Sequence, residues 1–182
     1  CKHRMNQMCS AMGRVQLRHY PERIQEIDRA MTYVSDRLDE LPGLRVVRPP
    51  KGSGMTKGGW YLPICHYDSS RLGGLKVRKF TDALKAEGVQ CNPGANPPIH
   101  GLAYFHDLDF FHLGKPAVEA FGQPRIETNT DADLPVTMAV AEKNFILPWF
   151  KHFDIPAIDC YINAFRKVIA HAEELVQEQE NA

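Results

Sequence analysis

The sequence of 182 residues predicts an α/β protein, and within this chain an α+β arrangement: a small, mostly antiparallel sheet covered by helices on one face. Two observations predict this class. Apolar residues recur at steps of three and four in several segments, which is typical of helices that bury one face. Between these segments lie short runs rich in β-branched or aromatic residues and bounded by proline or glycine, which is typical of strands. The elements follow one another as helix, strand, strand, helix, strand, helix, strand, helix.

Two helices are predicted first, on either side of Pro21. The apolar stripe of the first consists of Met5, Met8, Met12 and Val15. Gly13 in this helix would let another backbone approach closely. The stripe of the second helix consists of Ile24, Ile27, Met31, Val34, Leu38 and Leu41. The sequence Pro42-Gly43 ends it.

Two strands are predicted next, over residues 44–48 and 60–67. The loop between them, residues 49–54, is rich in proline and glycine and cannot continue a sheet. Pro63 lies inside the second strand and indicates either an edge position or a bulge.

A third helix ends at Gly88, and its apolar face is formed by Val77, Phe80 and Leu84. It leads into a short extended segment at residues 89–92. Residues 93–133 are irregular, and loops of that length are uncommon unless they are functional or mobile. Aromatic side chains in this stretch are Tyr104, Phe105, Phe110 and Phe111.

The last third of the chain predicts helix, strand and helix. A helix begins near Asp133 and Pro135, because proline is favoured in the first turn of a helix. A short strand follows at residues 145–147. The apolar face of the final helix consists of Ile158, Ile162, Phe165, Ile169 and Ala172. The polar tail, residues 173–182, is expected to fray.

Composition argues against nucleic acid and membranes as partners. Basic and acidic residues number 22 each, so the formal net charge is zero and gives no electrostatic footprint for a polyanion. No apolar run reaches the roughly 20 residues of a transmembrane helix. No signal peptide is visible either.

The cysteines and histidines do not predict a metal site. Five cysteines are an odd number at irregular spacing, which fits neither a disulfide framework nor a Cys-x-x-Cys site. We therefore expect a reducing compartment and a cytoplasmic protein. His100, His106 and His112 lack the flanking carboxylates typical of a metal site.

Residues 4–17 read R-M-N-Q-M-C-S-A-M-G-R-V-Q-L, which resembles the R-M-x-E-x-x-A-x-x-G-x-x-Q-L helix of the DegT/DnrJ/EryC1/StrS sugar aminotransferases. Later segments are similar in the same order. Pro98-Ile99-His100 resembles the family's P-L-H segment. Leu134-Pro135-Val136 with Glu142 resembles the family's F-P-x-A-E segment. Ile146-Leu147-Pro148 resembles the family's S-L-P segment. The resemblance runs from Lys2 to about Lys167.

This resemblance implies that the chain is the C-terminal part of a longer enzyme that uses pyridoxal 5'-phosphate. Residues 1–20 would be the end of the large domain and an interface helix, and residues 21–182 the C-terminal small domain of the type I fold. The full enzyme would transfer an amino group from glutamate or glutamine to a keto sugar, a nucleotide-linked sugar or a cyclitol. It would act as a homodimer.

The resemblance also assigns roles to three residues. Lys2 stands where the family commonly has asparagine, and would bind the phosphate of the partner subunit's cofactor. Arg4 would line the same interface and bind substrate, since its planar fork suits a phosphate or a carboxylate; the alternative is a salt bridge to a neighbouring helix. His100 would contact a sugar hydroxyl, or else be a hydrogen-bonded structural histidine.

No catalytic residue is expected in this chain. No lysine matches the motif of the Schiff-base lysine, so residues such as Lys51 and Lys57 are expected to be surface amines. The isolated chain should therefore be inactive. Trp60 and Tyr61 are candidates for stacking on a sugar, although one of the two is expected in the core.

The alternative function is a non-catalytic, stand-alone α+β module for binding or dimerisation. The N-terminal helix distinguishes the two. In an intact enzyme it would be wedged between the large domain and the partner subunit, so Met5, Met8 and Met12 should be exposed in this chain. Burial of all three within the chain would favour the module.

Overall fold

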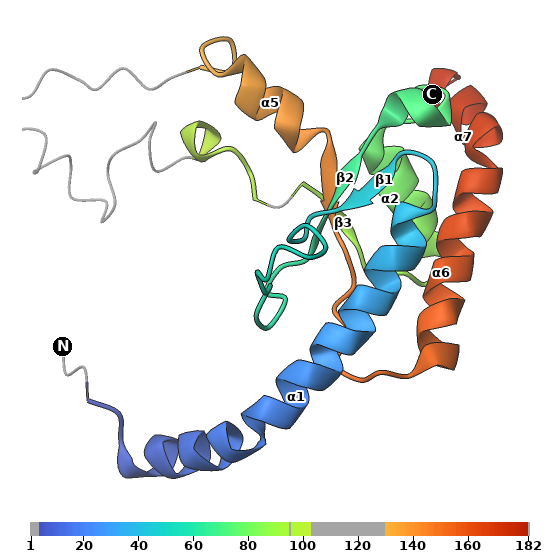
Figure 1. Cartoon of the computed structure of the whole chain (residues 1–182). Helices are drawn as coiled ribbons and strands as arrows, with labels where there is room; N and C mark the ends of the chain where they lie inside the picture. Colours follow the sequence, from blue (N-terminus) through green and yellow to red (C-terminus); the bar gives the residue numbers. More distant parts are fainter. Residues whose placement is uncertain (1–3, 95, 103–129, 182) are drawn as a thin grey trace, which may run out of the picture.

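A four-stranded antiparallel sheet with strand order β1-β2-β4-β3 forms the centre of the protein, as predicted. The computed structural model describes residues 4–94, 96–102 and 130–181 (Figure 1). The strands are β1 (Leu44–Val46), β2 (Ile64–Tyr67), β3 (Asn92–Pro93) and β4 (Asn144–Ile146). Cys65 of β2 lies opposite both Val46 of β1 and Phe145 of β4, which fixes the register across the central strands.

One face of this sheet is covered by helices. Alternation along β1 buries Leu44 and Val46 and exposes Arg45, and along β2 it buries Cys65 and Tyr67. The helices α1 (Gln7–Asp39), α2 (Val77–Ala86) and α6 (Ile155–Ala170) pack against one another and onto this face. Short 3-10 turns, η1 (Ser69–Leu72) and η2 (Ile99–Gly101), lie in the connections.

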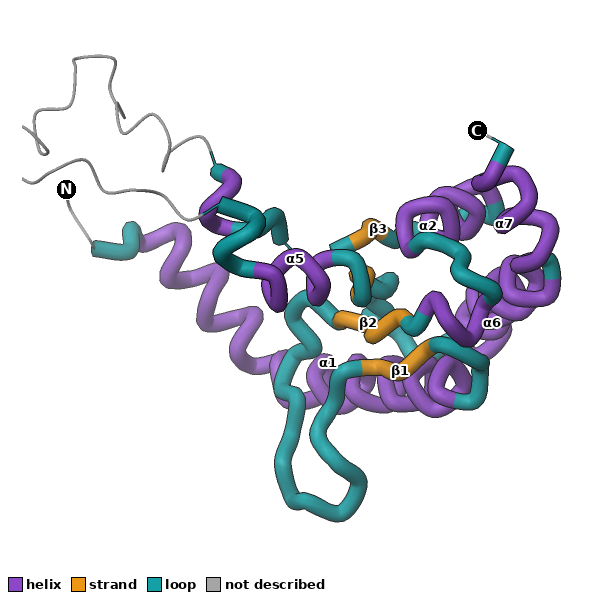
Figure 2. Tube along the Cα trace, turned by 90° about the horizontal axis from the view of Figure 1, so that it is seen from above, coloured by secondary structure: helices purple, strands orange, loops and turns teal. Residues whose placement is uncertain are grey.

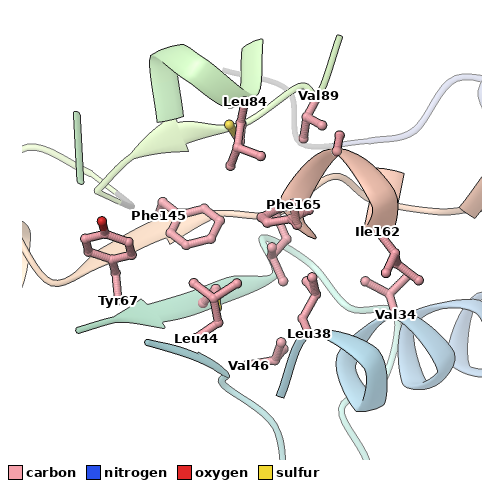
Figure 3. Packing of buried hydrophobic residues seen from close by; sticks show 14 of the residues in the cluster. Val34, Leu38, Leu44, Val46, Tyr67, Leu84, Val89, Phe145, Ile162 and Phe165 are labelled. Atoms are coloured by element: carbon pink, nitrogen blue, oxygen red, sulfur yellow. The ribbon is translucent and has the colours of Figure 1, made fainter. Parts of the chain in front are cut away.

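Four aromatic rings form the centre of the core, and three of them, Tyr67, Phe145 and Phe165, are labelled in Figure 3. Phe80 of α2 lies 4.9 Å from Tyr67 and 5.7 Å from Phe145, measured between ring centroids. Phe145 in turn lies 6.1 Å from Phe165 of α6. The Tyr67 hydroxyl donates a hydrogen bond of 2.8 Å to the carbonyl of Leu75, so this buried polar atom is satisfied. Burial raises the pKa of the Tyr67 hydroxyl.

Helix α1 continues through Pro21, so the predicted separation into two helices is wrong. Proline removes one backbone donor and its ring crowds the carbonyl of Leu17, which bends a helix without necessarily ending it. Figure 1 shows α1 changing direction along its length. The Asn6 side chain caps the helix by accepting a 2.8 Å hydrogen bond from the amide of Cys9. Buried residues occur only in its C-terminal half: Ala30, Met31, Val34, Ser35 and Leu38.

The second strand is shorter than predicted. It begins at Ile64, because Trp60 and Leu62 have φ angles of +55° and +48°, which an extended strand does not allow. The first strand likewise ends at Val46 instead of residue 48. As expected, one of the two adjacent aromatic residues is in the core: Trp60 is buried and Tyr61 is exposed.

The C-terminal tail does not fray, contrary to the prediction. It forms α7 (Ala172–Glu180), which packs beside α2. The Nζ of Lys79 lies 2.8 Å from Glu178, and Gln179 accepts a 2.9 Å hydrogen bond from the amide of Lys76. Polar residues here make tertiary contacts that the composition of the tail does not reveal. Helix α5 (Pro135–Ala141) begins at its proline as predicted and has no buried residue.

The described cysteines are all free thiols. Cys9 and Cys160 are exposed, whereas Cys65 and Cys91 are buried. Burial raises the pKa of Cys65 to about 12 and that of Cys91 to about 11, so both thiols stay neutral near pH 7. Among the residues described, no cluster of metal-ligating side chains occurs, and no helix is long and apolar enough to cross a membrane.

Substitution of Val34 by aspartate should destabilise the fold. Val34 is 3% exposed and lies beside Ile162 of α6 (Figure 3), so an aspartate there would bury a charge without a partner. We expect the free energy of unfolding in urea to fall by about 3 kcal/mol or more. The matched control is Val15→Asp on the exposed half of the same helix, which should change it by less than about 0.5 kcal/mol. A change below about 1 kcal/mol at Val34 would mean that this stripe is not part of the core.

Candidate functional site

Three exposed segments lie on the side of the molecule away from α6 and α7 (Figures 1 and 2). They are the N-terminal half of α1, the loop between β1 and β2 at residues 47–63, and the segment that contains η2 and α5. Of the predicted site residues that the structure describes, Arg4 lies directly before the first segment and His100 lies in the third.

The N-terminal half of α1 has almost no cover from the rest of the described chain. The exposed fractions range from 53% to 77% for Met5, which lies directly before the helix, and for the apolar residues Met8, Met12, Val15 and Leu17 within it. The predicted exposure of the three methionines is therefore confirmed. A contiguous group of exposed apolar side chains is typical of a surface that another chain or domain covers.

Arg4 precedes the capping residue of α1 and is exposed. Among the described residues, no ion pair joins Arg4 to a carboxylate, so the alternative salt bridge to a neighbouring helix is not present there. Lys2 lies outside the described residues. Within the described ranges, Arg4 and His100 share no hydrogen bond, and the structure does not bring these two candidates into one cluster.

His100 lies in η2 and its side chain is only 8% exposed. Its Nε2 is 2.8 Å from the Oδ1 of Asp131, which is 72% exposed. A carboxylate can only accept a hydrogen bond, so Nε2 carries the proton. In the neutral ring Nδ1 is then an acceptor. This contact also joins the chain before residue 103 to the chain after residue 129.

Asp133 stabilises the turn that presents Asp131. Its Oδ2 accepts 2.8 Å hydrogen bonds from both the amide and the hydroxyl of Thr130. The backbone hydrogen bond from Thr130, then the one from its hydroxyl, and finally the nearby His100 lower the pKa of the Asp133 carboxyl. Sequence reasoning missed this group, although Thr-x-x-Asp before a proline-initiated helix is a pattern typical of a local side-chain to backbone turn.

The loop that presents Tyr61 has a strained backbone. Within the described ranges, Trp60 and Leu62 are the non-glycine residues with positive φ. A left-handed conformation costs roughly 1–2 kcal/mol for such a residue and persists only where the surroundings enforce it. Here the buried Trp60 indole donates a 2.8 Å hydrogen bond to Asp28 of α1. Tyr61, between the two strained residues, is 91% exposed.

Lys57 does not provide a site for the pyridoxal phosphate that the resemblance implies. Burial lowers the pKa of its amine, as required for a lysine that reacts with a carbonyl. However, its Nζ donates a 2.6 Å hydrogen bond to the carbonyl of Val47 and lies 5.6 Å from the centroid of the Trp60 ring. The amine therefore has a structural role in holding this loop.

Two cavities do not offer the desolvated lysine that Schiff-base chemistry uses. One of about 710 Å³, beside Trp149 and Tyr161, has no carboxylate in its lining, and its lysine, Lys85, is exposed. The other, of about 650 Å³, is lined by Asp39 and Asp68, which already accept hydrogen bonds from Val46, Arg48 and Ser70, and by the exposed side chains of Glu40, Arg45, Arg71 and Lys143.

Comparison with protein families gives one match. The model of the DegT/DnrJ/EryC1/StrS aminotransferase family matches residues 1–166. Comparison with curated proteins gives no match.

Solved structures share the fold. The aminotransferase TlmJ from Streptoalloteichus hindustanus is 23% identical, with a TM-score of 0.59, and the match covers 91% of this chain and 37% of TlmJ. DesI, solved with its TDP-sugar product, is 22% identical, with a TM-score of 0.61 over 97% of this chain and 38% of DesI. The apo form of Spr1654 from Streptococcus pneumoniae, a putative sugar aminotransferase, is 15% identical, with a TM-score of 0.64 over 97% of this chain and 37% of that one. The chain thus spans well under half the length of these proteins, and it shares the fold of the part that it matches.

Replacing Thr130 by valine should raise the pKa of Asp133 part of the way to its ordinary value. The substitution removes the hydroxyl donor and keeps the amide donor, and each favours the charged carboxylate. Because the pKa of Asp133 is lower in the folded state than in the unfolded state, the charged carboxylate stabilises the turn at any pH above the unfolded-state pKa. This stabilisation is lost as the pH falls through the folded-state pKa. NMR titration of the Asp133 carboxyl carbon measures the shift, and Thr130→Ser, which keeps the hydroxyl, is the control. Identical titration curves for wild type and Thr130→Val would contradict this account.

Proposed function

Because the chain belongs to the DegT/DnrJ/EryC1/StrS aminotransferase family, we propose that it is the C-terminal portion of a PLP-dependent sugar aminotransferase. Residues 1–20 would form the end of the large domain and the interface helix, and residues 21–182 the small domain. The observation that carries this proposal is the exposed apolar half of α1, which has no counterpart to pack against within the described chain. A stand-alone module would be expected to bury those methionines.

The proposed reaction moves an amino group from glutamate or glutamine to a keto sugar, a nucleotide-linked sugar or a cyclitol. The related structures support this class of substrate, since DesI was solved with a TDP-sugar product and a related dehydratase with a trapped PLP-glutamate adduct. Pyridoxal phosphate, when bound, would supply the electron sink for this chemistry. The residues that hold it would come from the rest of the enzyme, because the lysines that the structure describes are exposed or, like Lys57 and Lys79, hydrogen-bonded within the chain.

Three residues of this chain would complete the site. Lys2 would bind the phosphate of the partner subunit's cofactor as a point charge. The exposed guanidinium of Arg4 has no carboxylate partner among the described residues, which leaves its fork available for a substrate carboxylate or phosphate. The hydrogen bond between His100 and Asp131 holds the ring in place, and in the neutral form Nδ1 would accept a hydrogen bond from a sugar hydroxyl.

The same proposal includes a homodimer in the cytoplasm. In such a dimer the large domain would cover one side of the N-terminal half of α1 and the partner subunit would cover the other. This arrangement agrees with the exposure of side chains on most sides of this half of the helix. Free cysteines in the described chain fit a reducing compartment.

The coding sequence upstream of Cys1 tests the proposal directly. A continuous reading frame that encodes a domain with the cofactor-binding lysine would support the enzyme. A start codon immediately before Cys1 would contradict it and would favour the binding or dimerisation module.

The isolated chain should neither catalyse transamination nor bind pyridoxal phosphate covalently. The expected result is no turnover with glutamate and keto sugars, and no new absorbance band when the cofactor is added, because the available lysines lie outside any cofactor site. Borohydride reduction followed by peptide mass spectrometry should find no stoichiometric adduct. The complete protein, treated in the same way, is the positive control. A stoichiometric adduct at one specific lysine of this chain would contradict the proposal.

A further inference from the structure

Tyr61 differs from an ordinary surface residue in three ways: its exposure, the strained backbone on both sides of it, and its aromatic ring. Tyr61 is 91% exposed, and it lies between two non-glycine residues with φ angles of +55° and +48°. A strained backbone at such residues is characteristic of sites where geometry serves function. An aromatic ring also has a large apolar face and, in tyrosine, a polar tip.

The base of this loop is fixed on several sides. The Trp60 indole donates to Asp28 of α1, and the Lys57 amine donates to the carbonyl of Val47 at the end of the first strand. The carbonyl of Pro63 accepts a 2.8 Å hydrogen bond from the amide of Leu147. These contacts hold the backbone on both sides of Tyr61, so the ring is presented from a rigid support.

The position of the loop relates it to the proposed site. It lies on the same side of the molecule as the N-terminal half of α1 and the segment with η2 and α5 (Figures 1 and 2). Arg4 lies directly before the first of these two segments, and His100 lies in the second. An apolar side chain can contact another domain in many orientations, so such a contact does not require a strained backbone. An aromatic ring that binds a ligand must be held in one orientation, and the strained, hydrogen-bonded backbone would provide this.

We propose that Tyr61 recognises the acceptor substrate by placing its ring against the face of the keto sugar or cyclitol. This inference rests on the proposed function. A pyranose or cyclitol ring has an apolar face and polar edges, which match the face and the hydroxyl tip of tyrosine. Because the support is rigid, little conformational freedom is lost on binding. Tyr61 would act as a specificity residue and would take no part in transferring protons.

The test uses the complete enzyme and separates its two half-reactions. Tyr61→Ala should raise the KM for a TDP-linked keto sugar about tenfold and leave the rate of the half-reaction with glutamate unchanged. Tyr61→Phe, which keeps the ring, should restore most of the affinity. Met55→Ala is the matched control, because Met55 is 68% exposed in the same loop; it should behave as wild type. Circular dichroism and the melting temperature should be the same for all variants.

A readout without turnover accompanies the kinetics. In the complete protein, the ring resonances of Tyr61 should shift when the TDP-linked keto sugar is added, and those of the exposed Tyr20 should not. An unchanged KM in Tyr61→Ala, or an equal loss in both half-reactions, would overturn the inference. A lower melting temperature or a dissociated dimer with unchanged KM would instead make Tyr61 a protein contact.

The outcomes separate the two proposals. If wild type transaminates an acceptor and Tyr61→Ala has no effect on it, only the role of Tyr61 is wrong. If wild-type complete protein transaminates no keto sugar or cyclitol, the proposed function fails and the inference fails with it.

Discussion

The contact between the four aromatic rings is the interaction on which the rest of the fold depends. Tyr67, Phe80, Phe145 and Phe165 come from two strands and two helices that are distant in sequence. Their packing joins β2, α2, β4 and α6 in one cluster, and large aromatic side chains contribute most to core energetics because of the area they bury. The strands are only two to four residues long, and the apolar face of the sheet is buried by the helices packed on it. The rings therefore make this short sheet a platform that can hold exposed segments in place.

Helix α1 connects that platform to an apolar surface that the described residues leave exposed. Its C-terminal half is held by buried contacts and by polar ones, such as the 2.9 Å hydrogen bond from the Tyr33 hydroxyl to Asp159 of α6. Its N-terminal half has the same apolar spacing, but none of the residues that the structure describes buries it. A helix of this kind is stable in water largely through the face it buries, so its two halves should differ in local stability. In the proposed enzyme, the large domain and the partner subunit would cover the second surface.

The periodicity of apolar residues predicted most of the elements, because a helix that buries one face must repeat near 3.6 residues. This holds for α2 and α6 and for the stripe of α1 from Met31 to Leu38. The misses have physical causes. Pro21 is tolerated where a bend is acceptable, and α7 is held by contacts with α2 that are not local in sequence.

The site could be predicted less well than the fold. The resemblance pointed to Arg4 and His100, but the pairing of His100 with Asp131 depends on bringing together residues 31 positions apart. The sequence around Tyr61 predicts a regular strand, whereas the backbone there has positive φ angles at Trp60 and Leu62. The hydrogen bonds of the Trp60 indole and the Lys57 amine hold this conformation, and they leave no pattern in the sequence. The remaining parts of a cofactor site are absent from the described chain, and in the proposed enzyme they belong to its other portion.

Amide hydrogen exchange along α1 tests the central claim, that this helix lies half in a finished core and half in an interface. We expect amides 8–20 of the isolated chain to exchange much faster than amides 30–39, and to become protected in the complete protein. Protection of amides 8–20 in the isolated chain equal to that of amides 30–39 would contradict the account. So would rapid exchange of amides 8–20 that persists in the complete protein.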